Sequence, residues 1–79
     1  MNTQNITEKV KKCISAITSV TEIKDGALLK KDLGLDSLSL VAVIVALEES
    51  FNIAFDDADL DPGLIVTVKN LVALVEKHL

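Results

Sequence analysis

The chain has 79 residues, a formal net charge of −4 and an apolar fraction of 49%. A chain of this length forms one domain, residues 1–79, stable by about 3–5 kcal/mol, and this apolar fraction argues against disorder. With one cysteine, one histidine and no tryptophan or tyrosine, it has no internal disulfide, and we expect no metal site and no aromatic surface for stacking bases.

The longest apolar run, Leu40 to Leu47, is far shorter than the ~20 residues of a membrane helix. The N-terminal stretch lacks a secretory apolar region. We therefore expect a cytoplasmic protein with no membrane insertion. From Asp32 to Val68 there is no basic residue, so this part of the surface repels nucleic acid and favours partners with basic patches. A solvated acidic face kept for solubility is the alternative interpretation.

The first helix is predicted from about Asn5 to Ser19. Asn5 can cap it, and Glu8 three residues later can close a capping box. A buried stripe at helical spacing is predicted at Ile6, Val10, Cys13, Ile14 and Ile17. On this stripe Cys13 serves as a small hydrophobic residue.

Val20 to Asp36 reads as a long connection without regular structure. A loop of this length in a small domain is uncommon and usually functional. Gly34 is predicted to adopt a backbone conformation open to few other residues. We expect Leu28, Leu33 and Leu35 to anchor the loop to the core.

The second helix is predicted to begin at Asp36 or Ser37 and to end near Phe51–Asn52. Its expected core face consists of Val41, Ile44, Leu47 and Phe51. Further apolar residues lie off that face, at Leu38, Leu40, Val43 and Val45. A helix that is apolar nearly all round is normally surrounded. Because so short a chain cannot surround it, part of its surface should be exposed.

Asp61-Pro62-Gly63 is predicted to form a turn or the first turn of a short helix. Thr67 is the expected cap of a final helix whose buried stripe is Val68, Leu71, Val72 and Val75. Lys77 and His78 fall at its end, where we expect His78 to act only as a partner of the helix dipole. These elements predict an all-α fold: a small four-helix bundle with three long helices, a short third helix and a long first loop.

Ser37 is the candidate functional residue. Serine is a common helix cap, worth ~1 kcal/mol, and a cap alone is one interpretation. As a nucleophile Ser37 would need a base, but the one histidine, His78, lies near the C-terminus, and the Asp36 carboxylate alone is too weak. A phosphodiester on Ser37 would suit the positive end of the helix dipole. We therefore predict modification and not catalysis.

Three motifs resemble the acyl carrier protein family. Asp32-Leu33-Gly34 followed by Asp36-Ser37-Leu38 is similar to the family's attachment motif. Leu47 to Ile53 resembles the end of its second helix, and Thr67 to Leu71 the start of its last helix. The resemblance covers essentially the whole chain, including its length, acidic charge and element order.

The resemblance implies a carrier that is not an enzyme. A phosphopantetheinyl transferase would attach 4′-phosphopantetheine to Ser37, flanked by the motif residues Asp36 and Leu38. The arm would hold acyl groups as thioesters for loading and processing enzymes of the ligase, transacylase or ketosynthase type, in fatty acid, polyketide or related lipid biosynthesis. The implied carrier is a monomer, and partners dock mainly on the second helix. In some members the acyl chain enters the bundle, which here would be among Val41, Val45, Leu60, Ile65, Val68 and Leu71; an ordinary packed core is the alternative.

The chain departs from fatty-acid carriers at two positions. Those carriers usually have acidic residues two and five positions after the attachment serine, where this chain has Ser39 and Ala42. A neutral helix face beside the arm indicates a specialised pathway. The predicted partner-binding residues are Leu38, Ser39, Ala42, Val43, Glu48, Glu49, Asp56 and Asp57.

Two alternatives remain. An aminoacyl or peptidyl carrier would usually have Gly-Gly or Gly-His before the serine, where this chain has Leu35-Asp36. An unmodified acidic helical adaptor would use Ser37 only as a helix cap. Phosphopantetheine on Ser37 separates the adaptor from both carriers.

Overall fold

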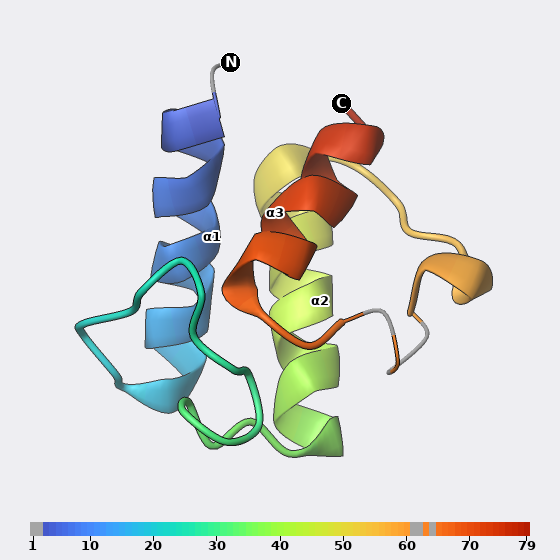
Figure 1. Cartoon of the computed structure of the whole chain (residues 1–79). Coiled ribbons are helices and arrows are strands. Elements are labelled where there is room, and N and C mark those ends of the chain that lie inside the picture. The colour runs from blue at the N-terminus through green and yellow to red at the C-terminus, as the bar shows by residue number, and fades with distance from the viewer. Residues whose placement is uncertain (1–2, 61–62, 64) are drawn as a thin grey trace.

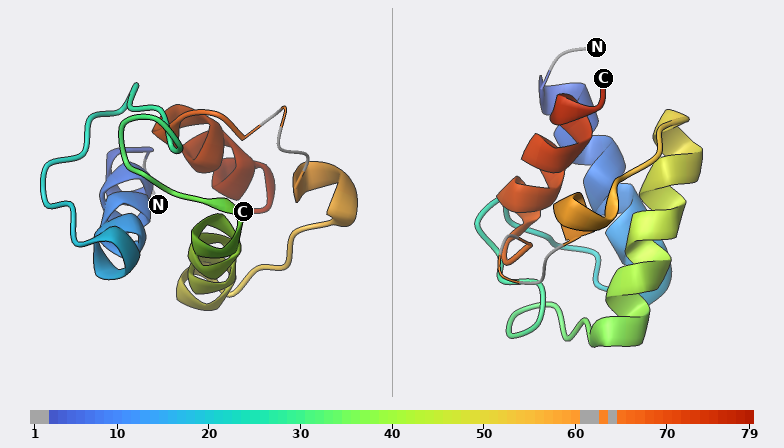
Figure 2. Two further views of the ribbon diagram at one scale, coloured as in Figure 1. Left: turned by 90° about the horizontal axis from the view of Figure 1, so that it is seen from below. Right: turned by 90° about the vertical axis from the view of Figure 1, so that its right-hand side faces the viewer.

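The computed structural model describes residues 3–60, 63 and 65–79. These residues form the α-helices α1 (Thr3–Thr18), α2 (Ser37–Phe51) and α3 (Val68–Lys77), and one 3-10 turn, η1 (Asp57–Leu60). The three α-helices surround a common core, and the start of α1 and the end of α3 lie at the end of the bundle opposite the start of α2 (Figures 1 and 2). The all-helical prediction is confirmed, but four helices are not: the fourth element is a single 3-10 turn.

Helix α1 buries the predicted stripe. Ile6, Val10, Cys13 and Ile14 are buried, and Ile17 packs partly against them. The predicted cap at Asn5 is wrong, because Asn5 lies inside the helix, whereas a capping residue needs a non-helical backbone. The helix ends at Thr18, and Ser19 follows with a positive φ of 63°.

The long connection between α1 and α2 is held to the core by apolar side chains. Leu33 and Leu35 are buried as predicted, but Leu29 is buried in place of Leu28, which is only half-buried. Leu28 forms an isolated antiparallel bridge with Thr67. Because successive side chains on extended backbone point to opposite sides, the residue after the bridge turns inward. Gly34 has the predicted special backbone, with φ +68°.

Helix α2 begins and ends where predicted, but its core face is rotated. Val43 is fully buried alongside Ile44, Leu47 and Phe51. Val41, expected in the core, is 59% exposed, and Val45 is exposed as well, so neither contributes to a sheltered interior. Two residues along a helix turn the side chain by about 200°. The inward position of Val43 therefore places Val41 on the outer side.

Helix α3 is capped by Thr67, whose hydroxyl accepts a hydrogen bond from the Asn70 backbone N–H, with Asn70 closing the capping box. Its predicted stripe of Val68, Leu71, Val72 and Val75 is buried. The prediction for Asp61-Pro62-Gly63 falls largely outside the described residues, and the short helical turn that is described, η1, lies just before it.

Candidate functional site

Ser37 is exposed and is the first residue of α2. The cap of α2 is the residue before it: Asp36 has an extended backbone, and its Oδ1 accepts a hydrogen bond of 2.8 Å from the Ser39 N–H. The interpretation of Ser37 as the helix cap is therefore wrong. Because Asp36 fills that role, the Ser37 hydroxyl is not needed to begin the helix.

Asp36 is held in its ionised form. Hydrogen bonds from the backbone N–H and side chain of Ser39 lower the pKa of Asp36 below its usual value. A carboxylate with a lowered pKa is a weaker base. His78 follows α3, whose end lies opposite the start of α2 in the bundle (Figure 1), and its ring is bonded to Asp59. Neither residue can therefore activate Ser37 as a nucleophile.

The start of α2 suits an anion. The first N–H groups of a helix have no intrahelical acceptors, and the aligned peptide dipoles place partial positive charge there. A phosphodiester on Ser37 Oγ would lie at this positive end, on an exposed side chain. The Asp36 carboxylate repels a second negative charge, but its Oδ1 accepts a hydrogen bond from the Ser39 N–H. The residues present therefore fit a phosphate-linked group on Ser37.

An apolar stripe runs along the outside of α2 from this point. It consists of Leu38, Val41, Ala42 and Val45, with Leu38 83% exposed. No charged residue occurs between Ser37 and Leu47. Sequence reasoning found Leu38 and Ala42 but assigned Val41 to the core. The spacing i, i+3, i+4, i+7 counted from Leu38 is the signal that would have found the complete stripe.

Of the other predicted contact residues on this helix, Ser39 is half-buried. The prediction that Val43 contacts partners is wrong, because none of its side chain is exposed. Val43 faces the core one helical turn before Leu47, which is also fully buried. The neutral outer face of α2 is therefore formed in part by Val41 and Val45, and not by Val43 as the sequence predicted.

The predicted acidic residues have unequal environments. Glu49 and Asp56 are exposed. Glu48 is half-buried, and its Oε2 accepts a hydrogen bond of 2.9 Å from the Phe55 N–H, so it also fixes the connection after α2. The backbone of Asp57 belongs to η1. Asp59, the next acidic residue along the chain, is buried and paired with Lys77 and His78.

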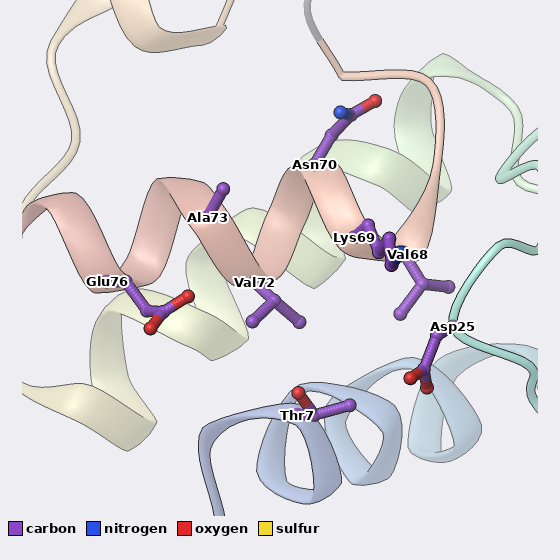
Figure 3. A pocket seen from close by; sticks show the side chains of 8 residues that line it. All are labelled: Thr7, Asp25, Val68, Lys69, Asn70, Val72, Ala73 and Glu76. Carbon is purple, nitrogen blue, oxygen red and sulfur yellow. The ribbon is translucent and has the colours of Figure 1, made fainter. Parts of the chain in front are cut away.

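A hollow of about 410 Å³ lies between α1 and α3 (Figure 3). Val68 and Val72 of α3 face Thr7 of α1 and Asp25 of the long loop there. Of the residues predicted to surround an acyl chain, Val68 lines this hollow, but none of the predicted attachment or partner-binding residues does. In residues 3–60, 63 and 65–79 there is no cluster of three metal-ligating side chains. No helix in this described part is long and apolar enough to span a bilayer.

Comparisons with known proteins agree with this geometry. Residues 8–75 match the family described as "Phosphopantetheine attachment site". An acyl carrier protein of Thermotoga maritima is 41% identical over 78 residues, covering 96% of this chain and 94% of its own. One from Desulforapulum autotrophicum is 37% identical over 76 residues, covering 92% and 96%. One from Buchnera aphidicola is 35% identical over 77 residues, covering 95% and 96%.

These matches define a phosphopantetheine-bearing domain over most of the chain. The chain belongs to the acyl carrier protein family, which confirms the resemblance. Its prosthetic group is 4′-phosphopantetheine, held covalently.

Proposed function

We propose that this chain, as a single domain over residues 1–79, is an acyl carrier protein of a specialised pathway that bears its arm on Ser37. The observation that supports this is the position of the Ser37 hydroxyl: exposed at the first residue of α2, with helix capping performed by Asp36. A hydroxyl that the fold does not use is available to a modifying enzyme. The family to which the chain belongs has such an attachment site.

Attachment is a transfer from coenzyme A. The Ser37 oxygen forms a bond to the phosphorus of the phosphopantetheine, the pyrophosphate bond breaks, and adenosine 3′,5′-bisphosphate leaves. The hydroxyl proton passes to a base of the phosphopantetheinyl transferase, since this chain offers none in reach. The bound group supplies a thiol that holds acyl groups as thioesters. The chain itself catalyses nothing and presents its cargo to other enzymes.

The partner surface is proposed on the outer face of α2. The apolar stripe with Ser39 lies beside the arm, and Glu48, Glu49, Asp56 and Asp57 follow at the far end. Exposed apolar surface of this kind commonly marks a protein contact. Because no charge lies between Ser37 and Leu47, we infer partners that differ from the basic-patch enzymes of fatty acid synthesis. We propose that the carrier acts as a monomer in the cytoplasm. Its partners are loading and processing enzymes of the ligase, transacylase or ketosynthase type.

The test is the intact mass after incubation with coenzyme A, magnesium and a broad-specificity phosphopantetheinyl transferase. We expect the wild type to gain one phosphopantetheine and Ser37→Ala to gain none. Ser50→Ala is the matched control, because it removes the hydroxyl of an exposed serine at the far end of the same helix and should still be modified. Modification of Ser37→Ala, or none of the wild type beside a carrier that the same enzyme modifies, would contradict the proposal.

A further inference from the structure

The turn before α2 brings two lysines to the end of the bundle that carries Ser37. The Leu35 N–H donates to the Leu29 carbonyl at 3.0 Å, and the Gly34 N–H donates to the Lys30 carbonyl at 3.1 Å. Lys30 therefore lies beside the residues that lead directly into the helix. This segment and the start of α2 lie at the same end of the molecule (Figures 1 and 2).

The same turn pairs with the segment that leads into α3. The Leu29 N–H donates to the Val66 carbonyl at 2.9 Å, next to the Leu28–Thr67 bridge. Between the two segments lies a hollow of about 310 Å³, called here the basic hollow, lined by Leu28, Lys30, Lys31, Ile65 and Val66. Its walls are aliphatic apart from the two lysines, and Val66 is 45% exposed.

The ammonium groups of Lys30 and Lys31 are available to bind an anion. Other cations are engaged within the fold: Lys11 pairs with Asp25, and Lys77 pairs with Asp59. In the described part of the chain neither Lys30 nor Lys31 has an ion-pair or hydrogen-bond partner for its ammonium, and both are exposed. The neighbouring acid, Asp32, accepts a hydrogen bond of 2.9 Å from the Leu28 N–H.

We propose that the basic hollow receives the protein's own phosphopantetheine arm, with an anionic group of the arm against Lys30 and Lys31 and an apolar portion on Leu28 and Val66. This inference rests on the proposed attachment at Ser37. Two cations above an aliphatic wall match a ligand that is anionic at one point and apolar beside it. The anion is either the phosphodiester or the terminal carboxylate of a dicarboxylic acyl cargo.

Tethering makes such a weak site effective. A group held on a short flexible linker has an effective concentration on the order of millimolar near its anchor. A hollow with a dissociation constant of ~1 mM would then be about half occupied. The exposed walls of the basic hollow suit contact of this strength, which holds the arm between partners without preventing its release.

The test compares amide NMR spectra of the apo, holo, butyryl-loaded and succinyl-loaded protein, each confirmed by intact mass. The reporters are the amides of Leu28, Lys31 and Val66, which lie apart from Ser37 in the sequence. We expect these amides to shift when the arm is present. In Lys30→Gln/Lys31→Gln the shift should fall at least threefold, while Lys12→Gln, an exposed lysine of α1, should leave it unchanged.

The outcomes separate the sources of the anion. A shift already present in the holo form supports the phosphodiester, and one that appears only in the succinyl form, not the butyryl form, supports the cargo carboxylate. Shifts confined to residues around Ser37, or equal in Lys30→Gln/Lys31→Gln and the wild type, overturn the inference. Absence of the mass gain itself would instead contradict attachment at Ser37, so the two failures are distinguishable.

Discussion

The His78 ring is fastened to Asp59, with Nε2 2.7 Å from Oδ2. The same carboxylate accepts a hydrogen bond of 2.8 Å from Lys77 Nζ, and the His78 ring meets Phe55 edge-on at 5.3 Å. Asp59 is 7% exposed. The end of α3 therefore holds η1 in place, which corrects the expectation that His78 is only a partner of the helix dipole.

This contact predicts an acid-sensitive component of stability. The Lys77 ammonium, the Asp56 backbone N–H and the His78 ring lower the pKa of Asp59 from 3.8 to about 2. Because the folded-state pKa is the lower one, ionised Asp59 stabilises the fold above pH 3.8 and this contribution is lost as the pH falls through about 2. Urea unfolding measured against pH should show this loss in the wild type.

The matched variants for this prediction are Asp59→Asn and Asp56→Asn. Asp59→Asn should be less stable than the wild type at neutral pH, and the difference should shrink towards pH 2. Asp56 is exposed, so Asp56→Asn should follow the wild-type curve closely. A constant difference between Asp59→Asn and the wild type across this range would count against the ionic contact.

The rotated core face of α2 predicts opposite outcomes for two valines. Val43 is 0% exposed and Val41 is 59% exposed. Val43→Ala should lower the free energy of unfolding by about 2 kcal/mol, because it removes buried methyl groups and leaves a cavity. Val41→Ala should change it by less than ~0.5 kcal/mol. Denaturant unfolding of both variants checks this, and equal losses would refute the assigned face.

Gly34 and Gly26 form a second matched pair. A Cβ at either position would meet nothing within 4 Å, but only Gly34 has a positive φ, +68°. Gly34→Ala should therefore cost ~1 kcal/mol through backbone strain alone. Gly26→Ala should be neutral or stabilising by up to ~1 kcal/mol, because it restricts the unfolded chain. Thermal unfolding would show the contrast, and a lower midpoint for Gly26→Ala than for Gly34→Ala would contradict it.

The absence of charge along the apolar stripe and at Ser39 predicts that introduced acidic residues change which partner enzymes the carrier serves. Ser39→Asp with Ala42→Glu should raise turnover by fatty acid synthase enzymes severalfold at low ionic strength, since their basic patches would then meet carboxylates. The gain should fade in high salt, where surface charges are screened. Steady-state rates at two salt concentrations measure both effects. No gain at low salt would show that acids at these positions do not select the partner.

Much of the fold follows from local sequence alone. The limits of α2, the Thr67 cap, the α3 stripe and the special backbone of Gly34 depend on helix periodicity, capping and glycine stereochemistry, which act between near neighbours. These features were predicted because each depends on a few adjacent residues whose preferences agree. The motif on which we base the proposed attachment at Ser37 is equally local.

Tertiary structure decided what local pattern left ambiguous. Because α2 is apolar on nearly every side, its sequence could not say whether Val41 or Val43 faces the core. Packing of α2 onto the rest of the bundle buried Val43. Whether Asp36 or Ser37 caps α2 depends on which of the two has the extended backbone before the helix. The pairing of Asp59 with His78 joins residues 19 positions apart in the chain. Sequence thus determined the helices and the motif on which the proposed attachment at Ser37 rests, while three-dimensional packing determined which side chains stay exposed on the outside of the bundle.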